Sequence, residues 1–170
     1  MRSVPLGGPV SRRTGGAQAG KALAVDCYQE RYVAHQARKR EVLRGLLAER
    51  HSERVFSDAA VSDDDLAAVM DAATRAPSSC DRHGVSVRVV RGRDDLALLG
   101  GLLVGGVGWV HRAPALLLLH GDPAAYKAPG EIDYMPYLDA GVMVGMMQLA
   151  AQSAGLRSCF VNPNVREHNR

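Results

Sequence analysis

The sequence predicts an α+β domain in which helices and strands form packed layers. Segments with helical periodicity alternate with short apolar or β-branched strand segments, but without the regular spacing of βαβ units. The longest helix candidate is apolar nearly all round, which requires burial on several sides. With 170 residues, 46% of them apolar, the chain can form one substantial core.

Residues 1–26 are predicted to be a disordered leader, and residues 27–170 to be the folded domain. Residues 1–20 are rich in Gly, Ser, Arg and Pro, which is typical of a segment that forms no core. Arg2, Arg12 and Arg13 occur there without acidic neighbours, as in a targeting peptide, but no apolar segment follows them.

Two helices are predicted before the first strand. The first covers residues 28–49 and ends at Arg50. The second has Ser62 as its N-cap, with Asp65 three residues on as in a capping box, and apolar residues then recur at helical spacing. Pro77 ends it, because the residue before a proline disfavours the helical conformation.

The middle of the chain predicts two strands joined through a helix. Residues 85–90 are β-branched and alternate, and residues 115–120 form a continuous apolar run, as in a buried strand. Residues 94–103 read as a short helix, and the glycines at 105–108 as a flexible turn, because they lack the spacing of a dinucleotide-binding loop. A surface loop is expected at 122–134.

The last predicted helix, at residues 135–154, is the longest apolar one. Gly141 and Gly145 lie four residues apart in it and would permit another helix to come close. Gly155 suits the position just after a helix end. A final strand is predicted at residues 157–161.

Composition argues against several classes of function. A net charge of +3 without basic runs interleaved with aromatics gives no indication of nucleic-acid binding. No apolar run has the length and freedom from charges of a membrane span. The three cysteines form no CxxC pair, which fits a reducing, cytoplasmic compartment. No metal site is predicted, since His111, His120 and Asp122 lack the spacing of known ligand sets.

The most distinctive polar run is Arg50-His51-Ser52-Glu53-Arg54. Guanidinium groups and a hydroxyl at this spacing suit a phosphate, because they offer several charge-assisted hydrogen bonds. The alternative is that arginines at a helix end cap carbonyl groups and stay solvated.

Three segments, in order, resemble the motifs of the FMN-dependent nitroreductase family. Its Arg-x-Ser-x-Arg/Lys run matches Arg50 to Arg54, and its Pro-Ser-Ser-x-Asn turn matches Pro77-Ser78-Ser79-Cys80-Asp81. Its helix ending Ala-x-Gly-Leu-Gly is similar to the stretch that opens at Leu138-Asp139-Ala140-Gly141 and ends at Ala154-Gly155-Leu156. The resemblance covers residues 49–164 and implies a mixed sheet flanked by helices, with a long buried central helix.

The resemblance also implies a cofactor and a site. Arg50, with His51 beside it, and Ser52 would hold the phosphate and ribityl chain of FMN, and Arg54 would approach the pyrimidine edge of the flavin. Pro77, Ser78 and Ser79 would shape the turn that carries Asp81 towards the flavin, and a backbone N–H at Asn162 or Asn164 would approach its N5. NAD(P)H would reduce FMN, which would then reduce a nitroaromatic, quinone or similar small molecule. No catalytic side chain is required.

The family usually forms an intertwined homodimer with FMN at the interface, and the 135–154 helix is our candidate for that contact. Its apolar residues lie on two faces, and one small sheet cannot cover both. A homodimer is therefore predicted.

Some positions depart from the family pattern. The family usually has asparagine where Asp81 stands, and Pro163 has no backbone N–H. The chain stops at Arg170, before the usual C-terminal segment. The alternative function is therefore a flavin-poor homologue that acts as a binding or interaction protein.

Overall fold

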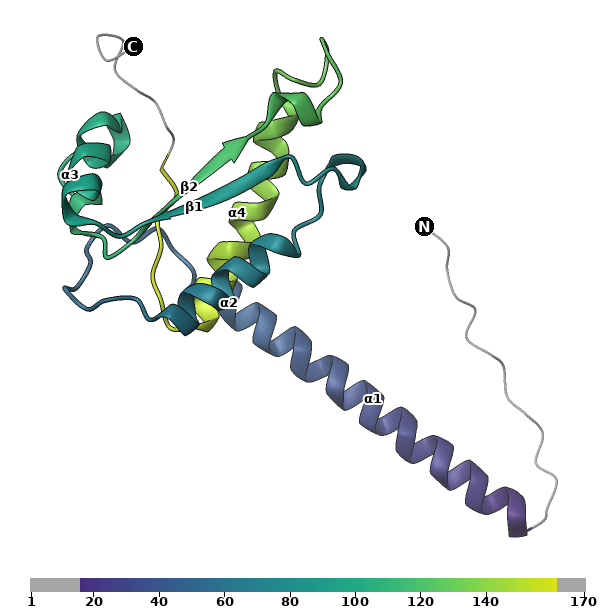
Figure 1. Cartoon of the computed structure of the whole chain (residues 1–170). Helices are drawn as coiled ribbons and strands as arrows, with labels where there is room; N and C mark the ends of the chain where they lie inside the picture. The colour runs from purple at the N-terminus through teal and green to yellow at the C-terminus, as the bar shows by residue number, and fades with distance from the viewer. Residues whose placement is uncertain (1–15, 162–170) are drawn as a thin grey trace. The chain divides into compact units, whose positions relative to one another are not determined.

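The computed structural model describes residues 16–161, with side chains from Tyr28 onward (Figure 1). The chain divides into two compact units, residues 1–44 and residues 45–170. The first unit contains most of helix α1, Gly16–Glu49. This helix begins within the predicted leader, and its side chains from Tyr28 to Arg44 are almost all exposed.

Helix α2, Asp63–Thr74, begins as its sequence predicts. The Ser62 hydroxyl accepts the Asp65 backbone N–H at 3.0 Å and donates to the Asp65 carboxylate at 2.6 Å. Acidic side chains at 63–65 also favour a helix N-terminus, where backbone N–H groups point outward. The predicted N-cap at Ser62 is confirmed, and the Asp65 side chain bonds to the Ser62 hydroxyl.

The sheet consists of β1, Val85–Val90, and β2, Leu116–Gly121, which pair antiparallel with Val85 opposite Gly121. Both strands were predicted to within one residue, and the α+β class is confirmed. Within residues 16–161 the predicted strand at 157–161 is not formed, because this segment makes only one isolated parallel bridge there, between Ser158 and Ser52. A strand needs a continuous ladder, but among the described residues this bridge has a single backbone hydrogen bond, from the Glu53 N–H to the Ser158 carbonyl at 3.1 Å.

Helix α3, Arg93–Leu102, packs with the turns that follow it. Short 3₁₀ turns at Val104–Gly106 and Val110–Arg112 replace the predicted flexible turn. A Cβ on Gly106 would lie 2.6 Å from a methyl carbon of Val110, so this glycine is needed for close packing. Leu96 and Val110 are almost completely buried here.

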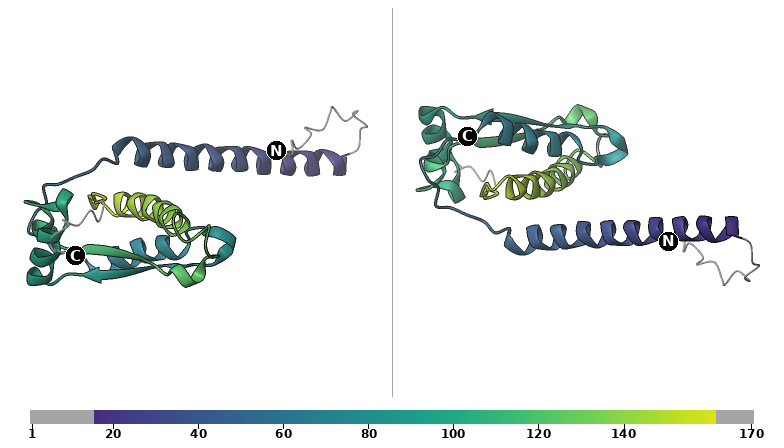
Figure 2. Two further views of the ribbon diagram at one scale, coloured as in Figure 1. Left: turned by 90° about the horizontal axis from the view of Figure 1, so that it is seen from above. Right: turned by 90° about the horizontal axis from the view of Figure 1, so that it is seen from below.

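Helix α4, Met135–Ser153, packs against α2 and the β1–β2 pair (Figure 2). Val69 and Ala73 of α2 meet Met147 and Ala151 of α4 in the main core. Gly155 ends the helix with a φ of +75°, as predicted for a residue without a Cβ.

Within a single chain α4 is buried on one side only, so the predicted burial on several sides would require a second chain. The side of α4 away from the core, which we call the open face, consists of Leu138, Gly141, Val142 and Gly145, all exposed. Leu138 is 57% exposed and Val142 45%. One helix and two strands cover one side of α4 only, so an apolar stripe stays at the surface.

Candidate functional site

The turn at residues 78–83 has an unusual backbone. Cys80, Asp81 and His83 have φ values of 51°, 57° and 50°, the left-handed region that non-glycine residues seldom adopt. The Asp81 carboxylate is exposed and lies 2.9 Å from Nε2 of His83. Several strained residues in one short turn require support from the surrounding structure.

Local hydrogen bonds give part of that support. The Asp81 N–H donates to the Ser78 carbonyl at 3.1 Å, and the Arg82 N–H donates to the Ser79 carbonyl at 3.2 Å. The Ser78 hydroxyl accepts the His83 N–H at 2.9 Å. Pro77, Ser78, Ser79 and Asp81 therefore form one ordered turn, as predicted.

The rest of the support comes from Asp139, on α4. Both of its carboxylate oxygens accept the Ser79 N–H, at 3.0 and 3.1 Å, and one also accepts the Tyr126 hydroxyl at 2.9 Å. Asp139 is 8% exposed and Tyr126 6%. Burial, followed by the hydrogen bond to Asp139, raises the pKa of Tyr126 to about 12, so the phenol stays a donor at neutral pH.

Arg82 and Glu131 add an ion pair next to this group. Arg82 Nη1 lies 2.5 Å from the Glu131 carboxylate, and its guanidinium lies 6.0 Å from the centre of the Tyr126 ring. The Lys127 backbone N–H, and then Arg82, lower the pKa of Glu131.

The Arg50–Arg54 run follows the end of α1. Arg50 is half-buried, while His51, Ser52 and Arg54 are exposed. Within the described residues, neither Arg50 nor Arg54 forms an ion pair or a side-chain hydrogen bond to a carbonyl. The alternative in which these arginines cap carbonyl groups is therefore not seen, and both cations remain available to an anion.

The residues next to the two arginines, in contrast, form hydrogen bonds within the chain. The Glu53 carboxylate accepts the backbone N–H groups of Val55 and Arg54, at 2.9 and 2.8 Å, and these bonds lower the pKa of Glu53. His51 lies 2.9 Å from the Glu49 carbonyl through Nδ1. Ser52 makes the parallel bridge to Ser158.

The two predicted halves of the site are attached near opposite ends of α4. Near the C-terminal end, Gln152 Nε2 donates to the Glu49 carboxylate at 3.2 Å, next to Arg50. Towards the N-terminal end, Asp139 holds the 78–83 turn. At 1.5 Å per residue the two anchors are about 20 Å apart along the helix, and Figure 1 shows this arrangement. Asn162 and Asn164 lie outside the described residues.

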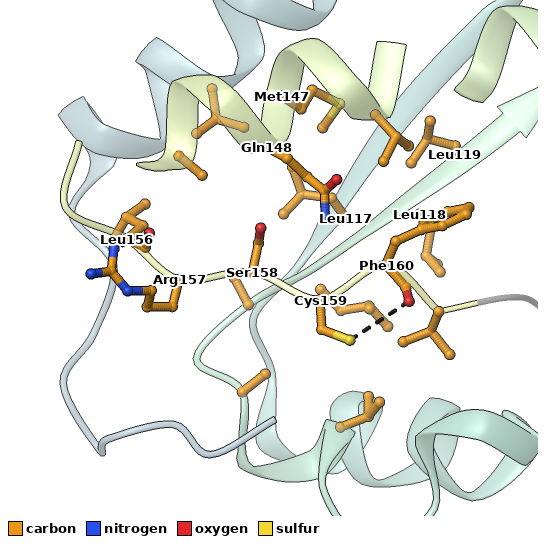
Figure 3. A pocket seen from close by; sticks show the side chains of 18 of the residues that line it. Leu117, Leu118, Leu119, Met147, Gln148, Leu156, Arg157, Ser158, Cys159 and Phe160 are labelled. Carbon is orange, nitrogen blue, oxygen red and sulfur yellow. Dashed lines mark hydrogen bonds between the residues drawn. The ribbon is translucent and has the colours of Figure 1, made fainter. Parts of the chain in front are cut away.

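A cavity of about 1090 Å³, mostly apolar, lies among β2, α4, the 53–61 loop and the segment after Gly155 (Figure 3). None of the predicted site residues in the described part of the chain lines it, although Glu53 does. Trp109, the single tryptophan, lines it and stacks on Phe56 with ring centres 6.2 Å apart. The sequence analysis missed this cavity; the apolar run at 116–119 was its only signal.

The edge of β2 that faces away from β1 also lies at this cavity. The Asp122 N–H donates to the Gly84 carbonyl, which makes these residues a hydrogen-bonded pair. Since such pairs alternate in an antiparallel ladder, the backbone N–H and C=O groups of Leu117 and Leu119 point away from β1. Both leucines line the cavity.

Other kinds of site find no support in residues 16–161. No group of three or more His, Cys, Asp or Glu side chains there could hold a metal ion. No helix among them combines the length and apolar character needed to cross a membrane. Cys80 and Cys159 are free thiols.

Solved structures with this fold come from several bacteria. An FMN-dependent nitroreductase from Clostridium difficile R20291 superposes with a TM-score of 0.64 at 26% identity, over 73% of this chain and 68% of that one. NfrA2 of B. megaterium gives 0.59 at 25% identity, over 68% and 51%. A candidate nitroreductase from Desulfovibrio desulfuricans, in complex with FMN, gives 0.57 at 27% identity, over 66% and 63%. The chain thus spans about half to two thirds of these structures.

Sequence comparison points the same way. The model of the nitroreductase family matches residues 47–101, which include the Arg50–Arg54 run and the 78–83 turn. No curated protein sequence matches the chain significantly. The family match and the shared fold together show that the chain is similar to the nitroreductase family, and they support membership of it.

Proposed function

We propose that this protein is an FMN-dependent oxidoreductase that takes electrons from NAD(P)H and passes them to a nitroaromatic, a quinone or a similar small acceptor. Bound FMN supplies the hydride and electron chemistry, while the protein binds, orients and tunes it. The proposal is supported by the family match and by two structural relatives, one named FMN-dependent and one in complex with FMN.

One observation carries the proposal: Arg50 and Arg54 have no acidic partner in the described residues, and Ser52 lies between them. Two uncommitted guanidinium groups and a hydroxyl are a donor set that fits a phosphate monoester. The residues present therefore suit the phosphate end of FMN.

Each residue then has a separate task. Arg50 and Ser52 hold the phosphate and ribityl chain. Arg54 would approach the pyrimidine edge of bound FMN, where its positive charge would favour the negative charge that reduction brings to the ring. The 78–83 turn presents Asp81 to the flavin. The proposed reaction requires no general acid or base from the described side chains.

The proposed site requires two chains. A single chain keeps the Arg50 run and the 78–83 turn about 20 Å apart along α4. The open face of α4 is apolar and exposed, which suits contact with a second copy. We therefore propose a homodimer in which each flavin touches both chains, in a reducing, cytoplasmic setting that suits the free thiols.

The decisive experiment is to load the purified protein with FMN, remove the excess, and measure the flavin retained per chain. Oxidation of NADH and of NADPH is then followed with a quinone and with a nitroaromatic acceptor. We expect retained FMN and acceptor-dependent oxidation of at least one nicotinamide. Protein that retains no FMN at micromolar concentration would remove the proposal.

The cavity favours a second candidate function, that of a flavin-poor binding protein. The outward backbone groups of Leu117 and Leu119, beside an apolar lining, suit an extended apolar peptide strand that would extend the sheet from β2.

Fluorescence of Trp109 can test this alternative, because it is the only tryptophan and lines the cavity. A short peptide of alternating leucine and threonine should change the emission saturably. A matched peptide with prolines at the pairing positions lacks the needed N–H groups and should not. Equal responses to both peptides would exclude strand pairing.

A further inference from the structure

Asp139 is a buried carboxylate that the proposed flavin chemistry does not use. It is 8% exposed and is the only charged residue in α4. No Lys, Arg or His among the described residues forms an ion pair with it. A buried charge without a cation is unfavourable, and an apolar residue of similar volume is often neutral or better for stability. Its presence in the core therefore needs an explanation other than stability.

Its two donors indicate what that explanation is. The Ser79 N–H is shared between both carboxylate oxygens, at 3.0 and 3.1 Å. The Tyr126 hydroxyl, at 2.9 Å, fixes the orientation of the carboxylate from the other side. Ser79 lies 60 residues from Asp139 in sequence, so this contact ties the turn to the long helix.

The turn that is held in this way is strained immediately after the point of attachment. The left-handed residues Cys80 and Asp81 follow Ser79 directly. Without the carboxylate, the half-buried Ser79 N–H would lose its acceptor, and the turn could relax towards ordinary backbone angles. The direction in which Asp81 points would then change.

We propose that Asp139 is a positioning residue for the flavin: by holding the Ser79 N–H, it sets the backbone of the 78–83 turn and so the placement of Asp81. This inference rests on the proposed flavin site. It does not make Asp139 a catalytic residue, since Asp139 acts through Ser79 and touches no flavin.

Three variants separate positioning from general stability. Asp139→Ala removes the acceptor. Asp139→Asn keeps a carbonyl oxygen for Ser79 and an NH₂ group for the Tyr126 oxygen. Met147→Ala, in the same helix but in the core with Val69 and Ala73, is the control for lost stability.

Two readouts are needed. One is the hydrogen exchange of the amides at Ser79 to His83, measured without flavin. The other is the dissociation constant for FMN, measured at a temperature at which all variants are folded. In the wild type we expect the Ser79 amide to be protected. Rapid exchange there would overturn the inference even if Asp139→Ala does not fold.

For Asp139→Ala we expect faster exchange in the turn and FMN binding at least about fivefold weaker, as for a buried group left unsatisfied. Asp139→Asn should restore both to within about threefold, and Met147→Ala should change neither in the folded protein. Unchanged FMN affinity in Asp139→Ala would refute positioning. The turn could respond as expected while even the wild type binds no FMN. In that case the proposed function, and with it the role of Asp139 in flavin binding, would be wrong. The structural role of the hydrogen bond between Asp139 and Ser79 would still be supported.

Discussion

Gln152 donates to the carboxylate of Glu49 over 3.2 Å, and Arg157 in turn donates to the Gln152 carbonyl oxygen over 3.0 Å. Gln152 is 7% exposed. The amide therefore fixes the end of α1, and so the start of the Arg50 run, against the C-terminal end of α4. The proposed phosphate ligands are thus anchored on the core, although the run itself forms no regular structure.

Arg50→Ala should weaken FMN binding about ten- to a hundredfold, because a charge-assisted contact to phosphate is worth about 1.5–3 kcal/mol. Fluorescence titration of FMN measures the affinity. Arg88→Ala is the matched control, since Arg88 is exposed on β1, outside the proposed site, and makes no ion pair within the described residues. Wild-type affinity in Arg50→Ala would show that Arg50 does not bind the phosphate.

Asp81→Asn should tighten the binding of reduced flavin and raise the midpoint potential, because an anion near the ring opposes the charge gained on reduction. The midpoint potential of the bound flavin, measured for the wild type and for Asp81→Asn, checks this prediction. A potential that stays constant or falls in Asp81→Asn would show that Asp81 does not face the flavin.

Glu131 should contribute a stability that depends on pH. The pKa of this group is lowered from 4.5 in the folded protein by the Lys127 N–H and Arg82. A lowered pKa means that the ionised group favours folding above about pH 4.5, and that this contribution is lost as the pH falls through the lower folded-state value. Glu131→Gln should thus destabilise the protein at neutral pH and flatten the decline on acidification.

Urea unfolding at several pH values from 3 to 7 measures this effect. Asp71→Asn is the control: Asp71 also pairs with an arginine, Arg75, but both side chains are more than half exposed. The hydrogen bond to Arg75 lowers the pKa of Asp71 as well, but exposed pairs contribute little, so its curve should depart from that of the wild type less than the curve of Glu131→Gln does. Parallel curves for Glu131→Gln and the wild type would exclude a role for the Arg82 pair.

Local signals in the sequence predicted the elements that depend on a few neighbouring residues. Ser62 and Asp65 bond to each other within one helical turn, and Gly155 needs only its own backbone freedom. The 157–161 strand failed because a strand depends on a partner, and apolar alternation does not reveal whether the partner is present. The composition of α4 likewise indicates that both of its sides need to be covered, but it does not reveal which segment or chain covers them.

The residues of the candidate site likewise fall into those that local sequence signals reveal and those that depend on distant partners. The Arg50 run and the 78–83 turn are contiguous motifs, so their residues could be named from the sequence. The tie from Asp139 to Ser79 spans 60 residues, and Tyr126 joins it from a loop, so neither contact could be predicted. A signal for Asp139 did exist, since it is the single charge in an otherwise uncharged helix.

The open face of α4 gives the last prediction, that Gly145→Leu weakens the homodimer. A Cβ on Gly145 meets no atom within 4 Å, so a leucine there has room in the single chain and should not disturb its fold. If a second α4 lies against Leu138, Gly141 and Val142, however, the added side chain would hold the helices apart. Flavin retention should fall together with dimerisation, because the proposed site uses both chains.

Gly101→Leu is a matched control for this substitution. Gly101 is an exposed glycine in α3 whose Cβ position is equally open, so both variants gain the same side chain in a helix. Light scattering at micromolar concentration should show dimers for the wild type and Gly101→Leu, and a shift towards monomer for Gly145→Leu. A wild type that scatters as an 18.2 kDa monomer would contradict the dimer. It would also leave the Arg50 run and the 78–83 turn apart, because one chain attaches them at different ends of α4.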